Sequence, residues 1–516
     1  MPLRHLIILL YLAVTALAIL PPAHAACPPD SAFAFPVVPP DSADSARLTR
    51  RSWPRATAET AGFNIGLWAF DRYVKKGHYA YISWHTIKEN FRHGFNWDDD
   101  HLGTNMFAHP YNGALFFNAG RSNGFGFWQS SLFAIGGSAM WELFMESEYP
   151  STNDILATPI GGMALGEVLY RTSDLVLDDR QRGARRAGRE IAALLLSPMR
   201  GLTRLITGRA WQPRTTTGRR YGTPPLRLTI MAGARMLTHH DHHATRQAGG
   251  AFSFRMTYGR PFADSRTPYE QFSLRLDLNA MRGQPLLSRV EIIGQLAAWQ
   301  WVNAERLNLQ AGLYQHFDYF DSDTLTQGTI PRPKPNGVPY KLGTPASAGA
   351  GLRLQWRPRK HFRLDAYAHG NVVILGGILS DFYRFYHRNY NWSSGFSMKY
   401  GLSLQCGPRI TLSLADRYYR LYSWKGYPNE TDWSLTHNGR PTNVQGDNSR
   451  TLFNHLEAGL DCRIAPRLSA GIGFDWYARH TFYRTYMEFP EAGYATSNPL
   501  IYSRQMALRA MLTYAF

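Results

Sequence analysis

The residues best suited to chemistry lie in an apolar stretch between residues 96 and 172. Four polar residues there are separated by seven, four and four positions, so a helix would present them on one face. They are Ser131, Ser138, Glu142 and Glu146. Two carboxylates one helical turn apart repel each other unless a cation or a shared proton lies between them. Glu142 and Glu146 therefore belong either to a functional site or to a buried charge network.

Candidate partners for these carboxylates occur earlier in the same stretch. His109 has the chemistry of a general base, and Arg121 that of a counter-charge. Together with the two glutamates they are the catalytic candidates. The ligand-binding candidates are Asn105, Asn112, Ser131 and Ser138. The functional interpretation is a polar pocket inside a helical bundle, and the structural one is a network that only holds the helices together.

An acidic turn precedes His109. The segment from Asp98 to His101 contains metal-ligating residue types, but its spacing to His109 matches no metal motif. We therefore expect a solvated acidic turn. Asp154 closes a segment from Ser151 that is typical of a capping box, so we expect it to start a helix.

A run of histidines stands apart from this stretch. It consists of His239, His240, His242 and His243. Such runs bind Zn²⁺ or Ni²⁺ from the medium, often adventitiously. We expect no resident cofactor, and adventitious divalent metal at most.

The N-terminal residues are typical of a secretory signal peptide over residues 1–25. An apolar run from Leu6 to Leu20 is followed by a small-residue cleavage site ending at Ala25. The run is shorter than the roughly 20 residues that a spanning helix needs. Residues 26–58 are rich in Pro, Ala, Ser and Asp, and we expect a linker there.

Helical periodicity predicts a helical domain over residues 59–208. The expected helices are 61–74, 84–93, 109–120, 127–146, 151–176 and 183–207. Pro159 is expected to kink or break the fifth helix, because proline lacks an N–H. Glu167 and Arg171 have the spacing of an ion pair on that helix.

The chain is basic, with a formal net charge of +18. From Arg180 to Arg220 it has eleven arginines and one acidic residue, Glu190. Because an export signal is present, we expect this segment to meet anionic lipid and expect no nucleic-acid partner. We predict a basic amphipathic helix on a lipid surface, followed by a basic linker at 209–223.

From residue 224 to 516 the hydrophobic period changes to two. Apolar positions alternate with polar or small ones, as they do between residues 468 and 479, which is typical of a transmembrane β-barrel. The expected strands are 226–237, 249–260, 269–279, 288–301, 305–319, 343–357, 361–375, 391–406, 409–424, 450–463, 467–484 and 501–516. The predicted fold class is α+β multidomain, with an N-terminal helical domain followed by an antiparallel barrel of about twelve strands.

The connections between the later strands alternate between short and long, as in outer-membrane barrels. The last strand ends at Phe516 with apolar residues at every second position, and so resembles the terminal signal that the barrel-assembly machinery recognises. Cys406 and Cys462 would lie on strands separated by a third strand, roughly 9.5 Å apart. This exceeds the roughly 7 Å limit for a disulfide, so we expect both to be free.

The inward-facing positions of the predicted barrel carry many charges, among them Glu291, Arg417 and Glu457. A lumen of about twelve strands is intermediate between a filled core and an open pore. The strand pattern alone does not decide whether the barrel conducts. We also expect the helical domain either to plug the lumen or to lie in the periplasm.

The stretch from Asn105 to Glu167 resembles an uncharacterised bacterial family, a domain of unknown function in exported, outer-membrane-associated proteins. The motifs that carry the resemblance are HPYNGALFFNAGRSNGF, WELFMESEYPSTND and TPIGGMALGEVLYR. The resemblance implies an envelope location and this domain order, and no activity.

These patterns lead to three functional hypotheses for a protein of the cell outer membrane that contacts its lipid. The first is a barrel protein with a periplasmic or plug domain that handles solute or lipid, or supports envelope integrity. The alternative is an envelope hydrolase or lipid-modifying enzyme with its polar site in the helical domain. The third is an adhesin or metal-capturing protein that works through its outer loops.

Overall fold

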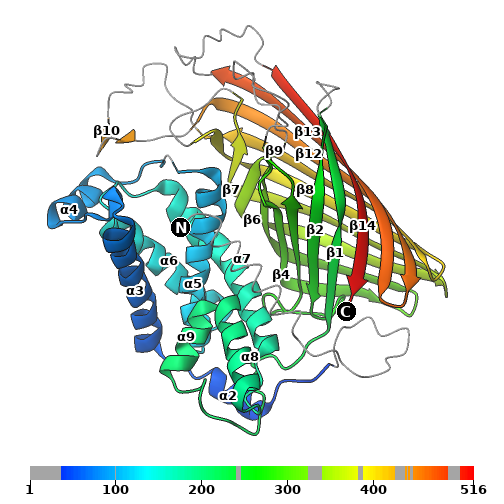
Figure 1. The fold of residues 1–516 in the computed structure, drawn as a ribbon, viewed down its shortest axis with the longest axis horizontal. Helices are drawn as coiled ribbons and strands as arrows, with labels where there is room; N and C mark the ends of the chain where they lie inside the picture. The colour runs from blue at the N-terminus through cyan, green and yellow to red at the C-terminus, as the bar shows by residue number, and fades with distance from the viewer. Residues whose placement is uncertain are drawn as a thin grey trace. The chain divides into compact units, whose positions relative to one another are not determined.

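A computed structural model describes residues 37–98, 100–239, 246–323, 340–381, 388–424, 436–437, 440–441, 446–485 and 500–516. The chain forms two compact units, a helical unit that ends at Pro225 and a β-barrel that begins at Leu226. Figure 1 shows the helices and the strands of these units. The predicted order, helical domain first and twelve-stranded antiparallel barrel second, is confirmed.

The described part of the helical unit contains eight α-helices and four shorter helical turns. The α-helices are α2 Ser42–Leu48, α3 Trp53–Phe70, α4 Trp84–His93, α5 His109–Ser122, α6 Phe127–Met140, α7 Thr152–Val176, α8 Gly183–Leu196 and α9 Pro198–Ile206. The shorter turns are the π-helical η1 Asp71–Lys75, η3 Thr104–Ala108 and η4 Trp141–Met145, and the 3₁₀-helical η2 His78–Ala80. Among the described helices, none has the length and hydrophobicity that crossing a membrane requires.

The described part of the expected linker is partly helical. The Asp41 carboxylate accepts hydrogen bonds from the N–H groups of Ala43 and Asp44, and this cap starts α2. α3 then begins at Trp53 with a proline in its first turn, where a missing N–H breaks no helical hydrogen bond. At the other end of the unit, the single helix expected over 183–207 is two helices, because Pro198 starts α9.

The predicted capping box at Ser151 is wrong, and α7 is not broken at Pro159. The Ser151 side chain makes no capping hydrogen bond, and its backbone N–H donates to Glu142 Oε2 at 2.7 Å. α7 continues through Pro159 from Thr152 to Val176. Close packing against α5 on both sides of the proline holds the helix together.

Glycines let α5 approach its two neighbours closely. A Cβ added at Gly113 would lie 1.8 Å from the Thr158 carbonyl oxygen, and one at Gly162 would lie 2.4 Å from the Gly113 carbonyl carbon. On α6, a Cβ at Gly137 would lie 2.4 Å from the ring of Phe116. Since no larger side chain fits these contacts, α5, α6 and α7 form a tight three-helix centre.

The basic segment at 180–220 forms α8 and α9, and some of its arginines are buried in the helical unit rather than at its surface. Arg186, Arg200 and Arg204 are buried at 6%, 3% and 2% exposure. Arg204 donates to Glu190 Oε2 at 2.8 Å and to Asp179 Oδ1 at 2.5 Å. These arginines are buried because acidic side chains inside the helical unit compensate their charge.

The barrel closes by antiparallel pairing of its first and last strands. Its strands are β1 Leu226–His239, β2 Arg246–Tyr258, β3 Phe272–Ala280, β4 Leu287–Asn303, β5 Leu307–Phe320, β6 Leu342–Arg359, β7 Phe362–Leu379, β8 Tyr390–Cys406, β9 Ile410–Ser423, β12 Asn448–Ala465, β13 Leu468–Thr485 and β14 Leu500–Ala515. β10 Thr436–His437 and β11 Arg440–Pro441 form a separate two-stranded sheet. Each barrel strand pairs with its neighbours in sequence, so every predicted strand is present and correctly placed.

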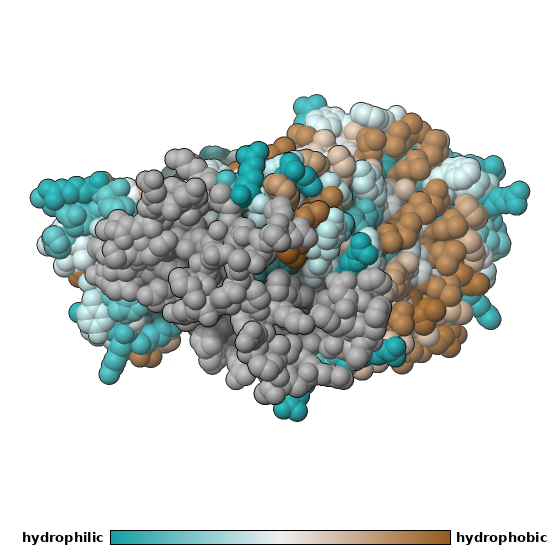
Figure 2. Space-filling view, turned by 90° about the horizontal axis from the view of Figure 1, so that it is seen from above, coloured by the Kyte–Doolittle hydropathy of each residue, from teal (hydrophilic) through white to brown (hydrophobic). Residues whose placement is uncertain are grey.

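The barrel wall is apolar outside and polar inside. Leu412, Leu414 and Ile472 face outwards and are 45%, 46% and 64% exposed. Arg417 and Asp475 lie on the same strands with the opposite orientation and are 4% and 1% exposed. Figure 2 shows hydrophobic side chains gathered over the strands. This is the pattern of a barrel wall that faces lipid.

The two described cysteines are free, as predicted. Cys406 and Cys462 both pair in register with Ile410 of β9, one from each side. A complete strand therefore separates the two thiols, while Cys27 lies outside the described residues.

Adjacent glycines of α6 offer a matched test of this packing. We expect Gly137→Ala to destabilise the helical unit by about 1–3 kcal/mol, because the added methyl group meets the Phe116 ring. Gly136→Ala points into open space and should be neutral or stabilising by up to about 1 kcal/mol. Urea unfolding followed by the helical circular dichroism signal measures both. Equal effects of the two substitutions would contradict the packing.

Candidate functional site

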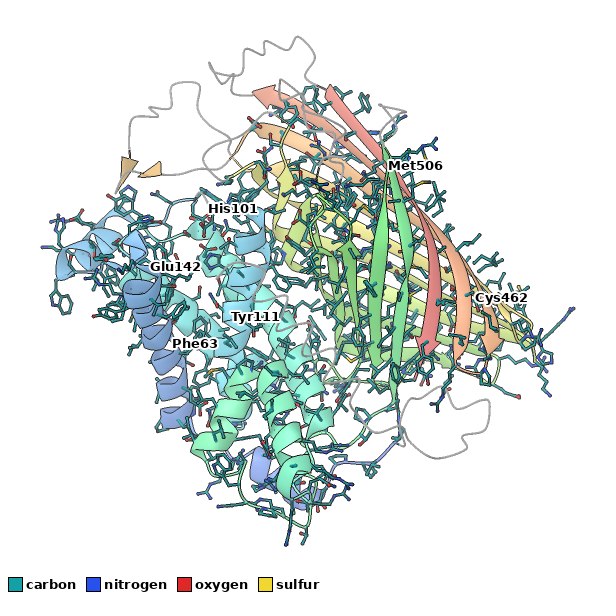
Figure 3. All side chains as sticks on the ribbon, viewed as in Figure 1. Phe63, His101, Tyr111, Glu142, Cys462 and Met506 are labelled. Carbon is teal, nitrogen blue, oxygen red and sulfur yellow. The ribbon has the colours of Figure 1, made fainter. Side chains whose placement is uncertain are left out.

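Acidic residues and one histidine gather at one end of the helical unit. This acid–histidine cluster consists of Asp98, Asp100, His109, Glu142, Glu146 and Asp154. Figure 3 shows Glu142 and His101 at the same end of the unit, above Tyr111 and Phe63 in that view. The residues of the cluster come from the segment before α5, the start of α5, the turn that follows α6 and the start of α7.

Two π-helical turns position the cluster. η3 leads directly into α5 at His109, and η4 continues α6 and carries Glu142. A π turn holds one residue more than an α turn, so it re-aims the side chains around it, and such turns are frequent at functional sites. The Glu146 carboxylate accepts a hydrogen bond from the indole of Trp141, and Glu142 reaches the start of α7.

His109 lies between two carboxylates. Its Nε2 is 3.5 Å from Asp100 Oδ2 and 3.7 Å from Asp154 Oδ2. The Asp154 side chain is 4% exposed, whereas that of Asp100 is 42% exposed. The cluster is thus buried at Asp154 and open to the surface at Asp100.

Amide side chains fix the carboxylates in place. Asn105 Nδ2 donates to Asp98 Oδ1 at 2.7 Å, and Asn153 Nδ2 donates to Asp98 Oδ2 at 2.8 Å. Asn153 also donates to Asp154 Oδ1 at 3.0 Å. The hydroxyl of Ser138 donates to the Asp154 carbonyl oxygen at 3.2 Å. Two predicted ligand-binding residues, Asn105 and Ser138, therefore support the cluster directly.

Burial and mutual repulsion change how the cluster holds protons. Burial raises the pKa of Glu142 well above its usual range, and the Asp154 carboxylate raises it further. Burial and the nearby acids likewise raise the pKa of Asp154 and that of Glu146. Burial alone would lower the pKa of His109, but Asp100, Asp98 and Glu142 outweigh it and raise the pKa to about 9. The cluster therefore holds protons more tightly than isolated carboxyl and imidazole groups do.

Such a set of groups is equipped for acid–base chemistry. Carboxyl groups with raised pKa values donate and accept protons near neutral pH, which a normal Asp or Glu does poorly. Asp98, His109 and Asp154 also offer ligand atoms that lie within 4.8 Å of one another. Carboxylate oxygens with an imidazole nitrogen are ligands that divalent cations accept.

Arg121, the predicted counter-charge, does not join the cluster. Its guanidinium binds Glu167 with two hydrogen bonds, of 2.7 and 2.9 Å, and also contacts the Tyr221 hydroxyl. Arg171 Nε donates to the same carboxylate at 2.7 Å, which confirms the predicted pair with Glu167. Burial alone would raise the pKa of Glu167, but the two arginines outweigh it and lower the pKa. Arg121 therefore holds α5 to α7.

The other predicted residues lie outside the acid–histidine cluster. The Ser131 hydroxyl donates to the Trp128 carbonyl of its own helix at 2.6 Å. Asn112 is half-buried on α5, one turn after His109. His239 ends β1, and the remaining histidines of the run, His240, His242 and His243, lie outside the described residues.

Sequence reasoning missed Asp98, Asp100 and Asp154 as site residues. The acidic turn was expected to be solvated and Asp154 to cap a helix, and the structure instead turns all three towards His109. The sequence did contain a signal. The acid-rich turn at Asp98 and Asp100 precedes His109 by a short segment, and Asp154 follows two helices later. Only the packing of α5 against α7 brings these segments together.

A second buried set of charges fills the barrel. Its centre is Glu457 on β12, which accepts hydrogen bonds from four arginines on other strands. They are Arg275 at 2.7 Å, Arg289 at 3.3 Å, Arg417 at 3.3 Å and Arg509 at 2.8 Å. His455, Glu457 and Asp475 also have metal-ligand geometry. The arginines already supply the positive charge that a metal would bring, so this set does not fit a cation site.

These ion pairs cross the bore of the barrel. In the closed strand order, six steps separate β4 from β12, so Arg289 and Glu457 start from opposite walls of the barrel. Arg417 of β9 likewise reaches Glu291 of β4 at 2.8 Å, five strands away. An apolar cluster lies beside them, formed by Phe320, Tyr340, Leu342, Val373, Ile378, Tyr419, Leu421, Phe453 and Tyr477, each at most 1% exposed. At this level described side chains from opposite walls meet inside the barrel.

Residues 94–199 match the family described as Domain of unknown function (DUF3943). The whole acid–histidine cluster lies within that range. The resemblance predicted from the three sequence motifs is thereby confirmed for this part of the chain. No curated protein matches the chain with a significant score.

The barrel is similar to those of solved outer-membrane proteins. A NanC porin matches with a TM-score of 0.27 and 8% identity, covering 56% of this chain and 98% of the other. A KdgM porin gives 0.23 and 7%, with coverage of 56% and 99%. OmpT of Vibrio cholerae gives 0.24 and 6%, with coverage of 57% and 97%.

The raised pKa of Glu142 predicts a pH dependence of stability. The folded state holds this proton to higher pH than the unfolded state does, so the contribution is present below the unfolded pKa, near 4.5, and is lost as pH rises. Glu142→Gln removes that loss. We expect the free energy of unfolding of Glu142→Gln, relative to that of the native protein, to rise as the pH is raised above 5. The rise is at most about 1.4 kcal/mol per pH unit.

Urea unfolding at several pH values, followed by the helical signal, measures this gain. Glu89→Gln is the matched control, because Glu89 lies at the surface of α4 beside Arg92. Its curve should run parallel to that of the native protein. A Glu142→Gln difference that is constant with pH, or that shrinks as pH rises, would refute the raised pKa.

Proposed function

We propose that this protein is an outer-membrane barrel protein that handles envelope lipid, and that its barrel anchors it in the membrane without forming an open pore. The observation that carries the proposal is the set of ion pairs across the lumen around Glu457. An open pore needs water along its axis, whereas Arg289, Arg417 and Glu457 are 3%, 4% and 8% exposed. The working part of the protein is then the helical unit.

Features of the barrel support the outer-membrane location. Closed barrels leave no unpaired strand edge, which is what lipid requires of a membrane-spanning sheet. The outer wall presents apolar side chains, and Trp299, Trp301 and Trp356 are exposed near the short-turn end of their strands. Aromatic girdles of this kind lie at the boundary between lipid and water.

Two partners follow from this proposal. One is outer-membrane lipid, against the apolar wall. The other is the barrel-assembly machinery, through the last strand with its outward-facing Leu508, Leu512 and Tyr514 before Phe516. The basic charge of the chain suits an anionic lipid surface, and the proposal includes no nucleic acid.

Conductance measurements test the closed lumen. In planar bilayers the native protein should show no steady open-channel current. Glu457→Ala leaves four buried arginines without their shared partner, so mutual repulsion should loosen the constriction and produce measurable current.

The control is Ser413→Ala, on the strand next to Glu457 but outside the constriction, where the hydroxyl makes only a 3.5 Å contact to a carbonyl. It should stay closed. A steady current through the native protein, comparable with that of a diffusion porin, would overturn the proposal that the barrel is an anchor.

A second candidate function is lipid modification at the acid–histidine cluster. The observation that favours it is the pairing of His109 with Asp100 and Asp154, at a place that opens to the surface. An imidazolium beside carboxyl groups of raised pKa is an arrangement suited to general acid–base catalysis of hydrolysis or group transfer. His109 and Asp154 would exchange the protons, and Asn153 would orient the carboxylates.

Lipid extracts of cells that produce the protein test this second function. We expect a mass change in an envelope lipid that depends on the protein and is lost in His109→Gln and Asp154→Asn. Glu89→Gln, the same kind of change at the surface, should retain it. If native protein and both site variants leave identical lipid profiles, the cluster does not modify lipid.

A further inference from the structure

α3 has the reverse of the usual distribution of polar and apolar side chains. It buries Glu59, Thr60 and Asn64, which are 6%, 7% and 0% exposed. It exposes Ile65 and Phe70, which are 49% and 39% exposed. A helix at the surface of a water-soluble domain does the opposite, because apolar side chains are hidden from water and charged ones are left in it.

α6 also exposes apolar side chains, although it buries others, among them Phe127 and Phe133. Trp128, Leu132 and Ile135 are 58%, 55% and 49% exposed, at positions that share one helix face. Ser130 and Ser138 are buried at 0% and 2% on the other side. No charged residue occurs from Phe127 to Trp141.

The two exposed faces form one surface. The ring centroids of Trp53 and Phe133 are 5.4 Å apart, and Asn64 Nδ2 donates to the Gly137 carbonyl at 2.9 Å. The first contact joins the start of α3 to the middle of α6, and the second joins the later parts of both helices, so the two helices pack against each other. We call the surface made by Trp53, Ile65, Phe70, Trp128, Leu132 and Ile135 the α3–α6 face.

The α3 side of this face is about as long as the apolar band of a barrel is tall. The 18 residues of α3 rise by about 27 Å at 1.5 Å per residue. The apolar band of outer-membrane barrels is about 25 Å tall.

Both ends of the face carry the residues that favour the membrane boundary. Beyond Phe70, Tyr73 and Trp84 are 69% and 86% exposed, and exposed lysines stand beside them at Lys75 and Lys76. At the opposite end, the exposed Trp53 comes two residues after the exposed pair Arg50 and Arg51, and Trp128 is exposed at the start of α6. Trp and Tyr collect at headgroup level, and Lys and Arg just outside it.

We infer that the α3–α6 face lies in the hydrocarbon of the membrane. The helical unit is then partly embedded in lipid. Its polar side chains, among them Glu59 and Asn64, point into its interior. This inference goes beyond the proposed function and does not depend on whether the barrel conducts. A second copy of the chain or a water-exposed surface are the outcomes that the test must distinguish from lipid.

Spin labels on the full chain test the inference. Cys27, Cys406 and Cys462 are first replaced by Ser, and Ile65→Cys or Ile135→Cys then carries a nitroxide. The protein is reconstituted in phosphatidylethanolamine and phosphatidylglycerol vesicles. Collision with oxygen, which concentrates in hydrocarbon, is compared with collision with a water-soluble nickel chelate. Leu412→Cys on the barrel wall is the lipid control, and the exposed Thr215→Cys is the water control.

We expect both face labels to be open to oxygen and to have lost access to the nickel chelate, as at Leu412. Nickel access equal to that at Thr215 would overturn the inference, and so would labels that neither reagent reaches, since another protein would then cover the face. The helical circular dichroism signal shows whether each variant folds. Leu132→Cys, on the same face, replaces any label that disturbs the fold.

Discussion

Every buried charge in this protein has to be compensated, and that constraint explains most of its internal architecture. Arg121 is held by Glu167, Arg204 by Glu190 and Asp179, and four arginines by Glu457. A lone charge in such surroundings would be strongly destabilising, so each pair ties together the elements that carry it. The acid–histidine cluster is the exception. It has more carboxylates than cations, and it meets the constraint by keeping protons, which is why the pKa values of Glu142 and Asp154 are raised.

The same constraint separates the roles of the two units. In the barrel, ion pairs run from wall to wall, and the described carboxylates Glu291 and Glu457 each have arginine partners. In the helical unit, the carboxylates of the acid–histidine cluster outnumber its cations, and the cluster opens to the surface at Asp100. Carboxylates that outnumber the nearby cations can take up a proton or a cation. A site with that capacity is where activity is expected.

Sequence reasoning recovered the strands well because a barrel's signal is local. Alternation, turn length and the ending at Phe516 can each be read within a few residues, and every strand was placed correctly. The site was recovered only in part. His109, Glu142 and Glu146 were selected because their residue types are unusual in an apolar stretch, whereas Asp98 and Asp154 have ordinary local explanations as a turn and a cap. Their partnership with His109 depends on π turns and on glycine contacts between α5 and α7, which no periodicity reveals.

The reversed faces of α3 were not predicted, for a related reason. Hydropathy averages over a helix, and the buried Glu59 and Asn64 cancel the exposed apolar residues that would mark a lipid-facing surface. The α3–α6 face also lies next to the acid–histidine cluster along the chain. α6 ends at Met140, and Glu142 follows at once in η4, so the acid–histidine cluster begins where the α3–α6 face stops. With that face in hydrocarbon, the cluster would lie at the depth of lipid headgroups. A protein that handles lipid would need its proton-exchanging groups at that depth, because the polar atoms of a lipid are found there.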